Sequence, residues 1–271
     1  MAMLEGKVAF VTGAARGQGR SHALRLADEG ATVIAIDVAG PVSEYNGYPA
    51  ATGDDLDETR KLLANRGSEH VVATVDVRDS HAMDLLLAEA LPTVGGRLDI
   101  VVANAGINNW NRFWEMSEEQ WLTMLDVNLT GVWRTLRASV PHMIAAGNGG
   151  SIITVSSVAG IKSLPGQAHY SAAKHGVVGL TKSAALELGE YGIRVNSVHP
   201  WGVSTAMLQD PSTEAMLAAH PQYLSSFAAA LPHLPIAESA DITEGVLWLA
   251  SEASRAVTGT QLTLDMGATK V

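Results

Sequence analysis

The arrangement of apolar and polar residues follows two patterns along the chain. Short continuous apolar runs of about four to eight residues, rich in β-branched side chains, predict buried strands, whereas longer stretches with an apolar residue every three or four positions predict amphipathic helices. We expect strands over residues 7–12, 32–36, 70–75, 98–103, 152–155, 194–198 and 261–264. We expect helices over residues 17–29, 54–66, 80–91, 117–128, 129–146 and 241–251, and another that starts at Tyr170.

This alternation of strands and helices predicts an α/β fold. We expect a single doubly wound (Rossmann) domain over residues 1–271, with a seven-stranded, mostly parallel sheet and helices on both faces. No internal repeat or linker divides the chain. In open sheets of this kind, ligands bind outside the carboxyl ends of the strands. Polar residues that follow strand ends are therefore the first candidates for a site.

Composition narrows the function. The 271 residues are 47% hydrophobic and 17% charged, which is typical of a globular protein that can bury a core. The net charge of −10 argues against nucleic acid or an anionic membrane as a partner. The chain has no cysteine, which excludes disulfides and thiolate nucleophiles, and its histidines lack metal-ligand spacing, so no metal site is expected. Without a signal peptide or an apolar run of about 20 residues, the expected location is cytoplasmic.

A glycine-rich turn follows the first expected strand. It holds Gly13, Gly17 and Gly19, with Arg16 and Gln18 between them, and it leads directly into a helix. Free backbone N–H groups and the positive end of the helix dipole at such a turn favour an anion. The arrangement predicts a site for the pyrophosphate of a dinucleotide.

The second expected strand ends at Asp37, about 20 residues beyond the glycines. A carboxylate there accepts a hydrogen bond from the 2′-hydroxyl of NAD and repels the 2′-phosphate of NADP. Arg16 favours the opposite choice, because a cation could bind that phosphate. We expect Asp37 to decide, because no lysine or arginine follows it closely, and hence NAD to be the cofactor.

Two segments fit neither pattern. Residues 38–53 are rich in glycine and proline and carry Tyr45 and Tyr48, so we expect an ordered insert that begins at Asp37 and lies near the adenosine. The alternative is a disordered surface loop. Residues 203–235 contain three prolines and several large apolar residues, and we expect a mobile substrate lid with one or two short helices. Plain surface packing is the alternative there.

A tyrosine and a lysine stand four residues apart at the start of one expected helix. Tyr170 and Lys174 share a helix face, so the ammonium is expected to lower the pKa of the phenol and make it a general acid/base. Ser157, at the end of the preceding strand, is placed to hydrogen-bond the same substrate oxygen. Trp110, Leu164, Trp201 and Met207 are expected near this pocket, which suggests a largely apolar substrate.

Taken together, these motifs resemble those of the short-chain dehydrogenase/reductase family along essentially the whole chain. The resemblance implies that Tyr170 is the general acid/base, Ser157 orients the substrate oxygen, and Lys174 lowers the tyrosine pKa and holds the nicotinamide ribose. It also implies that Asn128 anchors a proton-relaying water. The remaining matched positions imply contacts with the cofactor: Asp76 and Val77 near the adenine, the small residues Asn104, Ala105 and Gly106, and Pro200, Val203 and Thr205.

The insert resembles that of the carveol-dehydrogenase-like branch of this family. That branch is associated with the redox carrier mycofactocin and is thought to hold NAD without exchanging it. The resemblance implies an NAD-linked oxidoreductase that interconverts a secondary alcohol and a ketone. It also implies a homotetramer, with apolar residues such as Val132, Trp133, Val177 and Val178 at helix–helix interfaces. A catalytically silent, dinucleotide-binding regulator remains the alternative.

Overall fold

Seven parallel strands form one sheet in the order β3-β2-β1-β4-β5-β6-β7. The computed structural model describes residues 2–271. The expected single doubly wound sheet is confirmed, and each of its strand pairs is parallel. The strands are β1 (Val8–Thr12), β2 (Thr32–Asp37), β3 (His70–Thr74), β4 (Ile100–Ala103), β5 (Gly150–Val155), β6 (Ile193–Pro200) and β7 (Gln261–Leu264).

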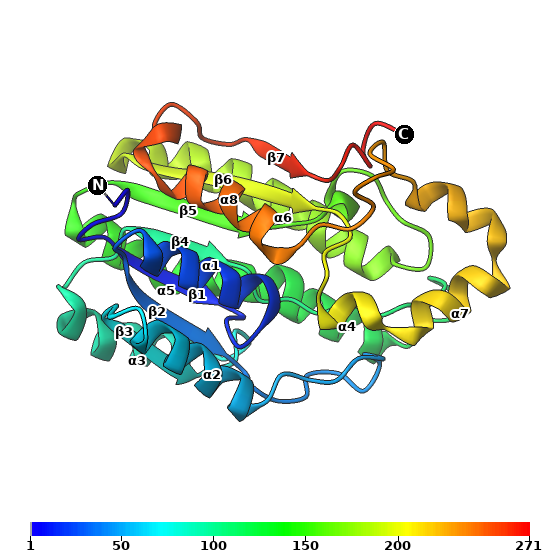
Figure 1. The fold of residues 1–271 in the computed structure, drawn as a ribbon, viewed down its shortest axis with the longest axis horizontal. Helices are drawn as coiled ribbons and strands as arrows, with labels where there is room; N and C mark the ends of the chain where they lie inside the picture. The colour runs from blue at the N-terminus through cyan, green and yellow to red at the C-terminus, as the bar shows by residue number, and fades with distance from the viewer. Residues whose placement is uncertain (1) are drawn as a thin grey trace.

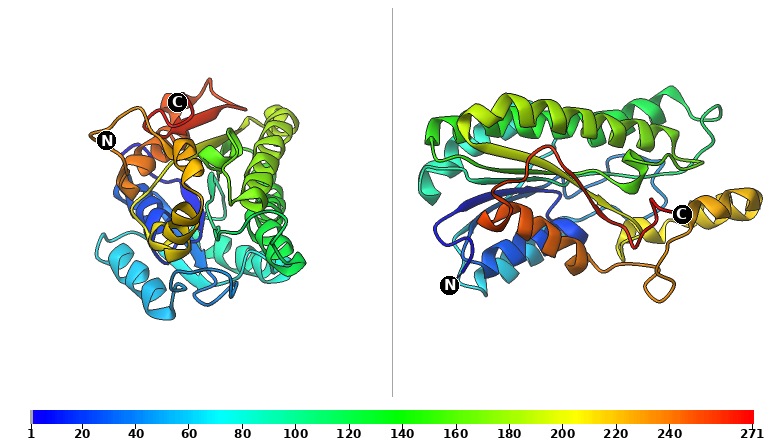
Figure 2. Two further views of the ribbon diagram at one scale, coloured as in Figure 1. Left: turned by 90° about the vertical axis from the view of Figure 1, so that its right-hand side faces the viewer. Right: turned by 90° about the horizontal axis from the view of Figure 1, so that it is seen from above.

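Helices cover both faces of the sheet, and each face has its own apolar core (Figures 1 and 2). One core packs α3, α4, α5 and α6 against the sheet, and the other packs α1, α2 and α8 against the opposite face. The helices are α1 (Gly17–Asp28), α2 (Gly53–Ala64), α3 (Ser80–Ala90), α4 (Glu118–Leu125), α5 (Gly131–Ala146), α6 (Ala168–Leu188), α7 (Pro211–Ala219) and α8 (Ser239–Ala250). Within residues 2–271, no helix combines the length and apolar character needed to cross a bilayer.

Two irregular segments lie at the carboxyl ends of the strands. In Figure 1 the insert that follows β2 runs along the lower edge of the molecule toward α4, and α7 projects beyond the sheet on the same side. The α7 segment also contains two short 3₁₀ helices, Ala206–Gln209 and Pro221–Phe227. The expected short helices of residues 203–235 are therefore present.

The largest departure from the sequence expectation lies around Asn128. We expected two helices that meet at residues 128 and 129, but α4 runs into α5 through a π-helical segment, Asp126–Thr130, without a break. Residues 126–130 contain no glycine or proline, so the chain continues as a helix. A π-helical segment widens one turn of the helix, and such segments are frequent at functional sites. Helix α6 begins at Ala168, two residues before the expected start.

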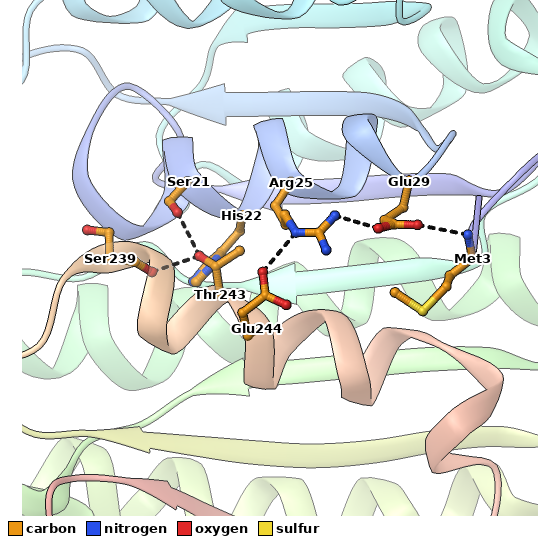
Figure 3. A network of polar contacts seen from close by, with 8 residues as sticks. All are labelled: Met3, Ser21, His22, Arg25, Glu29, Ser239, Thr243 and Glu244. Atoms are coloured by element: carbon orange, nitrogen blue, oxygen red, sulfur yellow. Dashed lines mark hydrogen bonds and ion pairs between the residues drawn. The ribbon is translucent and has the colours of Figure 1, made fainter. Parts of the chain in front are cut away.

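A buried histidine joins α1 to α8 (Figure 3). His22 Nδ1 lies 2.7 Å from Thr243 Oγ1, and that hydroxyl donates its own proton to the carbonyl oxygen of Ser239. Nδ1 must therefore carry the proton and donate, which leaves Nε2 as a buried acceptor. Within residues 2–271, Nε2 has no hydrogen-bond partner. Burial accordingly lowers the pKa of His22 to about 3.

We predict that His22 makes the fold sensitive to acid. Its folded pKa lies below the ordinary value of 6.5, so the unfolded chain binds the extra proton first. The stabilisation is full above pH 6.5 and is lost as the pH falls toward 3, at up to about 1.4 kcal/mol per pH unit. Urea unfolding between pH 7 and 4.5 should show a shallower loss of stability in His22→Asn, which keeps a donor near the Nδ1 position. The exposed His81→Asn variant is the control and should retain the wild-type slope; an equal slope in all three proteins would contradict this role.

Candidate active site

The glycine-rich turn between β1 and α1 is tied to the neighbouring strand end. Asn104 donates hydrogen bonds from Nδ2 to the carbonyl oxygens of Thr12 (2.9 Å) and Gly13 (3.2 Å). A Cβ atom on Gly19 would lie 2.0 Å from the Gly13 carbonyl oxygen, so only glycine fits there. Gly17 adopts a positive φ of 56° as the first residue of α1. The turn therefore presents the amino terminus of α1 to the cavity beside it.

Asp37 lies at the end of β2 with both carboxylate oxygens engaged. They accept hydrogen bonds from the backbone N–H groups of Ala15 (3.0 Å) and Ala39 (2.9 Å), and the side chain lines the cavity. Arg16 also lines the cavity, and its guanidinium donates to the carbonyl oxygen of Pro49 in the insert. Asp37 and Arg16, which favour opposite cofactors in the sequence, thus differ in their contacts: Asp37 is held by the glycine-rich turn, and Arg16 holds the insert.

Asn128 is fully buried in the π-helical segment. Its amide donates to the carbonyl oxygens of Ile107 (3.0 Å) and Met124 (3.1 Å), and its Oδ1 accepts from the Ile107 N–H (3.2 Å). A Cβ atom on Gly106 would lie 2.7 Å from Asn128 Oδ1 and 3.6 Å from Lys174 Nζ. The segment after β4, the π-helical segment and Lys174 therefore meet at one point.

Lys174 and Tyr170 lie side by side on α6, as their spacing predicts. The Lys174 ammonium is 5.5 Å from the centre of the Tyr170 ring. It is 3% exposed and donates to the carbonyl oxygen of Val155 at the end of β5 (2.9 Å). Ser157 follows Val155 by two residues, and its Oγ accepts from the Ala159 N–H (3.1 Å). The Ser157 hydroxyl also lies beside Tyr170, near enough to affect the pKa of the phenol.

The expected lowering of the Tyr170 pKa is wrong for the protein by itself. Burial raises the pKa of Tyr170 to about 12, and the neighbouring Ser157 hydroxyl opposes this only in part. Burial also lowers the pKa of Lys174, to about 8. The spacing of the two residues predicts only the attraction between an ammonium and a phenolate. The cost of burying the charged form of each residue has the larger effect on the two pKa values.

His199, for which the sequence predicted no functional role, supports this arrangement. A carbonyl oxygen can only accept, so the 2.7 Å contact shows that His199 Nδ1 donates to the backbone oxygen of Ser157. His199 Nε2 lies 2.8 Å from Ser197 Oγ, and burial lowers the pKa of the histidine to about 4. The ring is therefore neutral and holds the Ser157 backbone in place. A lone histidine before a proline carries no sequence signal for this role.

One cavity of about 360 Å³ brings the candidate residues together. Each residue that we proposed for catalysis or cofactor binding lines it: Gly13, Arg16, Gly17, Gln18, Gly19, Asp37, Asp76, Val77, Asn104, Ala105, Gly106, Asn128, Ser157, Tyr170, Lys174, Pro200, Val203 and Thr205.

Aromatic rings form the outer wall of the cavity. Phe227 lies between Trp110 and Trp201, with ring centres 5.7 Å and 5.9 Å apart. Leu164 and Met207 also line the cavity, so the four apolar residues expected near the pocket are all there. Phe227 and Met207 belong to the segment 203–235, which therefore covers the site.

The insert 38–53 lines the cavity along much of its length, from Val38 to Ala51. Besides Pro49, its anchors are three consecutive residues: Asn46 Oδ1 accepts from Asn109 Nδ2 (3.1 Å), the Gly47 N–H donates to Asp210 Oδ2 (3.1 Å), and the Tyr48 hydroxyl accepts from the Asn108 N–H (3.1 Å). Asp210 is 3% exposed and also caps the first turn of α7. The insert thus joins the segment after β4 to the segment 203–235, which no local pattern in the sequence predicts.

Comparison with known proteins places this architecture in a family. Residues 7–215 match the family described as short chain dehydrogenase. An uncharacterized NAD-dependent oxidoreductase of Mycobacterium tuberculosis is 50% identical over 272 residues, which cover 98% of this chain and 97% of that protein. A (−)-trans-carveol dehydrogenase of Rhodococcus erythropolis is 46% identical over 278 residues, which cover 99% of both chains. The chain belongs to the short-chain dehydrogenase family.

Two solved structures are similar along nearly the whole chain. A short chain dehydrogenase from Mycobacterium paratuberculosis bound to NAD has a TM-score of 0.97 at 43% identity, covering 99% of this chain and 100% of that one. A carveol dehydrogenase from Mycobacterium avium in complex with NAD has a TM-score of 0.93 at 44% identity, covering 100% of both. The resemblance to the carveol-dehydrogenase-like branch is confirmed.

Proposed function

We propose that this protein is an NAD-dependent dehydrogenase that interconverts a secondary alcohol and a ketone on a largely apolar, terpenoid-like frame. The observation that carries the proposal is the convergence of Ser157, Tyr170 and Lys174 on one cavity with a dinucleotide-type turn and an aromatic wall. The similarity to carveol dehydrogenases supports an alcohol as substrate. The apolar wall of the cavity is evidence that the substrate has a hydrophobic frame.

The residues around the cavity fit NAD. The amino terminus of α1 suits a pyrophosphate, and the Gly13 and Gly19 positions admit no side chain. The carboxylate of Asp37, held by two backbone N–H groups, suits a ribose hydroxyl and disfavours the 2′-phosphate of NADP. When bound, NAD supplies the hydride acceptor for alcohol oxidation.

The side chains take distinct roles in this proposal. Ser157 donates a hydrogen bond from its hydroxyl to the substrate oxygen and orients it. Tyr170 exchanges a proton with the same oxygen: it donates its phenol proton in ketone reduction, and in alcohol oxidation it takes the alcohol proton while its own proton passes to the neutral amine of Lys174. Lys174 places a positive charge beside the phenol, and its own pKa of about 8 lets it take part in proton exchange near neutral pH. Asn128 holds the strand-end segment at Ile107 and, through it, the shape of the cavity floor.

We expect Tyr170→Phe to abolish alcohol oxidation and to leave NAD binding nearly unchanged. The substitution removes the proton acceptor but keeps the ring and the pyrophosphate turn. The measurement is turnover on a panel of secondary alcohols and terpenols with a dye acceptor, together with bound NAD measured by chromatography. Tyr191→Phe, at an exposed position, is the control. A catalytically silent regulator of the same fold would show no turnover in the unsubstituted protein. Wild-type turnover in Tyr170→Phe would refute the proton-transfer role.

The insert and the lid together form a cover over the proposed NAD. Asp210 on the lid binds the backbone of the insert at Gly47, and Arg16 beside the glycine-rich turn binds it at Pro49. A cofactor under this cover leaves only when these contacts open, which slows dissociation. We therefore propose that NAD is retained and reoxidised in place by an external carrier such as mycofactocin.

We expect Gly47→Ala to release the cofactor faster. A Cβ atom at Gly47 would lie 2.2 Å from Asp210 Oδ1, so the insert must separate from the Asp210 carboxylate. Loss of a hydrogen bond to a charged group is worth about 1.5–3 kcal/mol, which corresponds to roughly a 10- to 100-fold faster loss of NAD. Exchange of bound for labelled NAD measures this rate.

The matched control is Gly53→Ala, at the end of the same insert, where an added Cβ meets no atom within 4 Å. It should keep the wild-type exchange rate. If the unsubstituted protein purifies without NAD and cycles freely with added NAD, the cover does not retain the cofactor and the proposal of reoxidation in place falls.

We further propose a cytoplasmic homotetramer. Trp133 on α5 and Leu186 on α6 are 47% and 86% exposed, which supports an interface on these helices. Three of the residues first considered for that interface, Val132, Val177 and Val178, are buried within the chain and do not contribute to this argument.

A further inference from the structure

The insert also brings a second phenol into the cavity. Tyr48 lines the same cavity as Tyr170 and Ser157. Its hydroxyl oxygen accepts the Asn108 N–H at 3.1 Å, which fixes the position of the ring tip. Within residues 2–271, the hydroxyl proton has no protein acceptor. The Tyr48 hydroxyl is therefore a hydrogen-bond donor that is held in place beside the active site and has no acceptor among the described residues.

The anchors of the insert tip place Tyr48 on the substrate side of the cavity. Asn46 is bound to Asn109, and Gly47 is bound to Asp210 of the lid. Asn108 and Asn109 lead directly into Trp110, which belongs to the aromatic wall. Pro49, the residue after Tyr48, is held by the Arg16 side chain of the glycine-rich turn.

The hydroxyl of Tyr48 stays protonated at physiological pH. Burial raises the pKa of Tyr48 to about 12, and the N–H of Asn108 opposes this only in part. Tyr48 is also close enough to Tyr170 that its negative charge, if formed, would raise the pKa of Tyr170. A neutral phenol is a hydrogen-bond donor, so Tyr48 suits an oxygen acceptor on a ligand.

Resting on the proposed dehydrogenase function, we propose that Tyr48 is a specificity-determining residue that donates a hydrogen bond to a second oxygen of the substrate, remote from the reacting carbon. The reacting oxygen already accepts hydrogen bonds from Ser157 and Tyr170, and two such bonds fill its usual capacity as an acceptor. The substrate class is therefore an alcohol with an apolar frame and a further hydroxyl or carbonyl group, such as a diol or a hydroxyketone.

The test compares the binding of cyclohexanol with that of the 1,2-, 1,3- and 1,4-cyclohexanediols by calorimetry on NAD-loaded protein. The unsubstituted protein should bind at least one diol more tightly than cyclohexanol. A neutral hydrogen bond contributes about 1 kcal/mol, so Tyr48→Phe should reduce that preference about fivefold. Affinity for cyclohexanol should be nearly unchanged.

Tyr45→Phe is the matched control. Tyr45 belongs to the same insert, but its hydroxyl accepts from Ser117 Oγ (2.9 Å) and the residue does not line the cavity. The diol preference should persist in this variant. An equal diol-to-cyclohexanol ratio in wild type and Tyr48→Phe, or loss of NAD with no change in that ratio, would overturn the assignment.

Binding is measured instead of turnover so that the two proposals fail separately. If no alcohol is oxidised but the diol preference depends on Tyr48, the proposed reaction is wrong and the binding role stands. If alcohols are oxidised and Tyr48→Phe leaves the ratio unchanged, the reaction stands and the role of Tyr48 is wrong.

Discussion

A lysine ammonium buried at the carboxyl edge of the sheet is the constraint on which the site depends. Lys174 is almost fully buried, and a buried charge is costly unless hydrogen bonds compensate it. It donates to Val155 at the end of β5, and the close approach of the segment after β4 requires glycine at position 106. Asn128 closes the same cluster by clamping Ile107. The ends of β4 and β5, the π-helical segment and helix α6 thus meet around one cation.

The cover over the cavity depends on contacts of a different kind. The insert has no regular structure over residues 38–52, and it is held by side chains and backbone groups far apart in the sequence. Its anchors are few and mostly single hydrogen bonds, so the free energy that keeps it closed is modest. Such a cover can retain a cofactor and still open on a functional timescale. The same contacts place Tyr48 in the cavity, so the proposed retention of NAD and the proposed selection of substrate depend on one segment.

Much of the site could be predicted because its residues follow local rules. The spacing of Gly13, Gly17 and Gly19, the position of Asp37, and the separation of Tyr170 and Lys174 are each legible within one strand-turn-helix unit. The parallel sheet then brings them to one edge. The roles of Asp210, Asn109 and His199 could not be predicted, because their partners lie 42 to 163 residues away. The pKa of Tyr170 was predicted in the wrong direction, because the depth of burial depends on the whole fold.

The dependence of alcohol oxidation on pH tests the role of the buried pair most directly. With the pKa of Tyr170 near 12, the group of the pair that titrates in the accessible range is Lys174, with a pKa of about 8. The rate with a dye acceptor should therefore rise as the pH passes through about 8 in the unsubstituted protein. The neutral amine is then available to take the proton that Tyr170 passes on, so Lys174→Met, which keeps the apolar stem and removes the amine, should be much slower and lack this inflection. An inflection near pH 8 that persists in Lys174→Met, or a flat profile in the unsubstituted protein, would contradict the account.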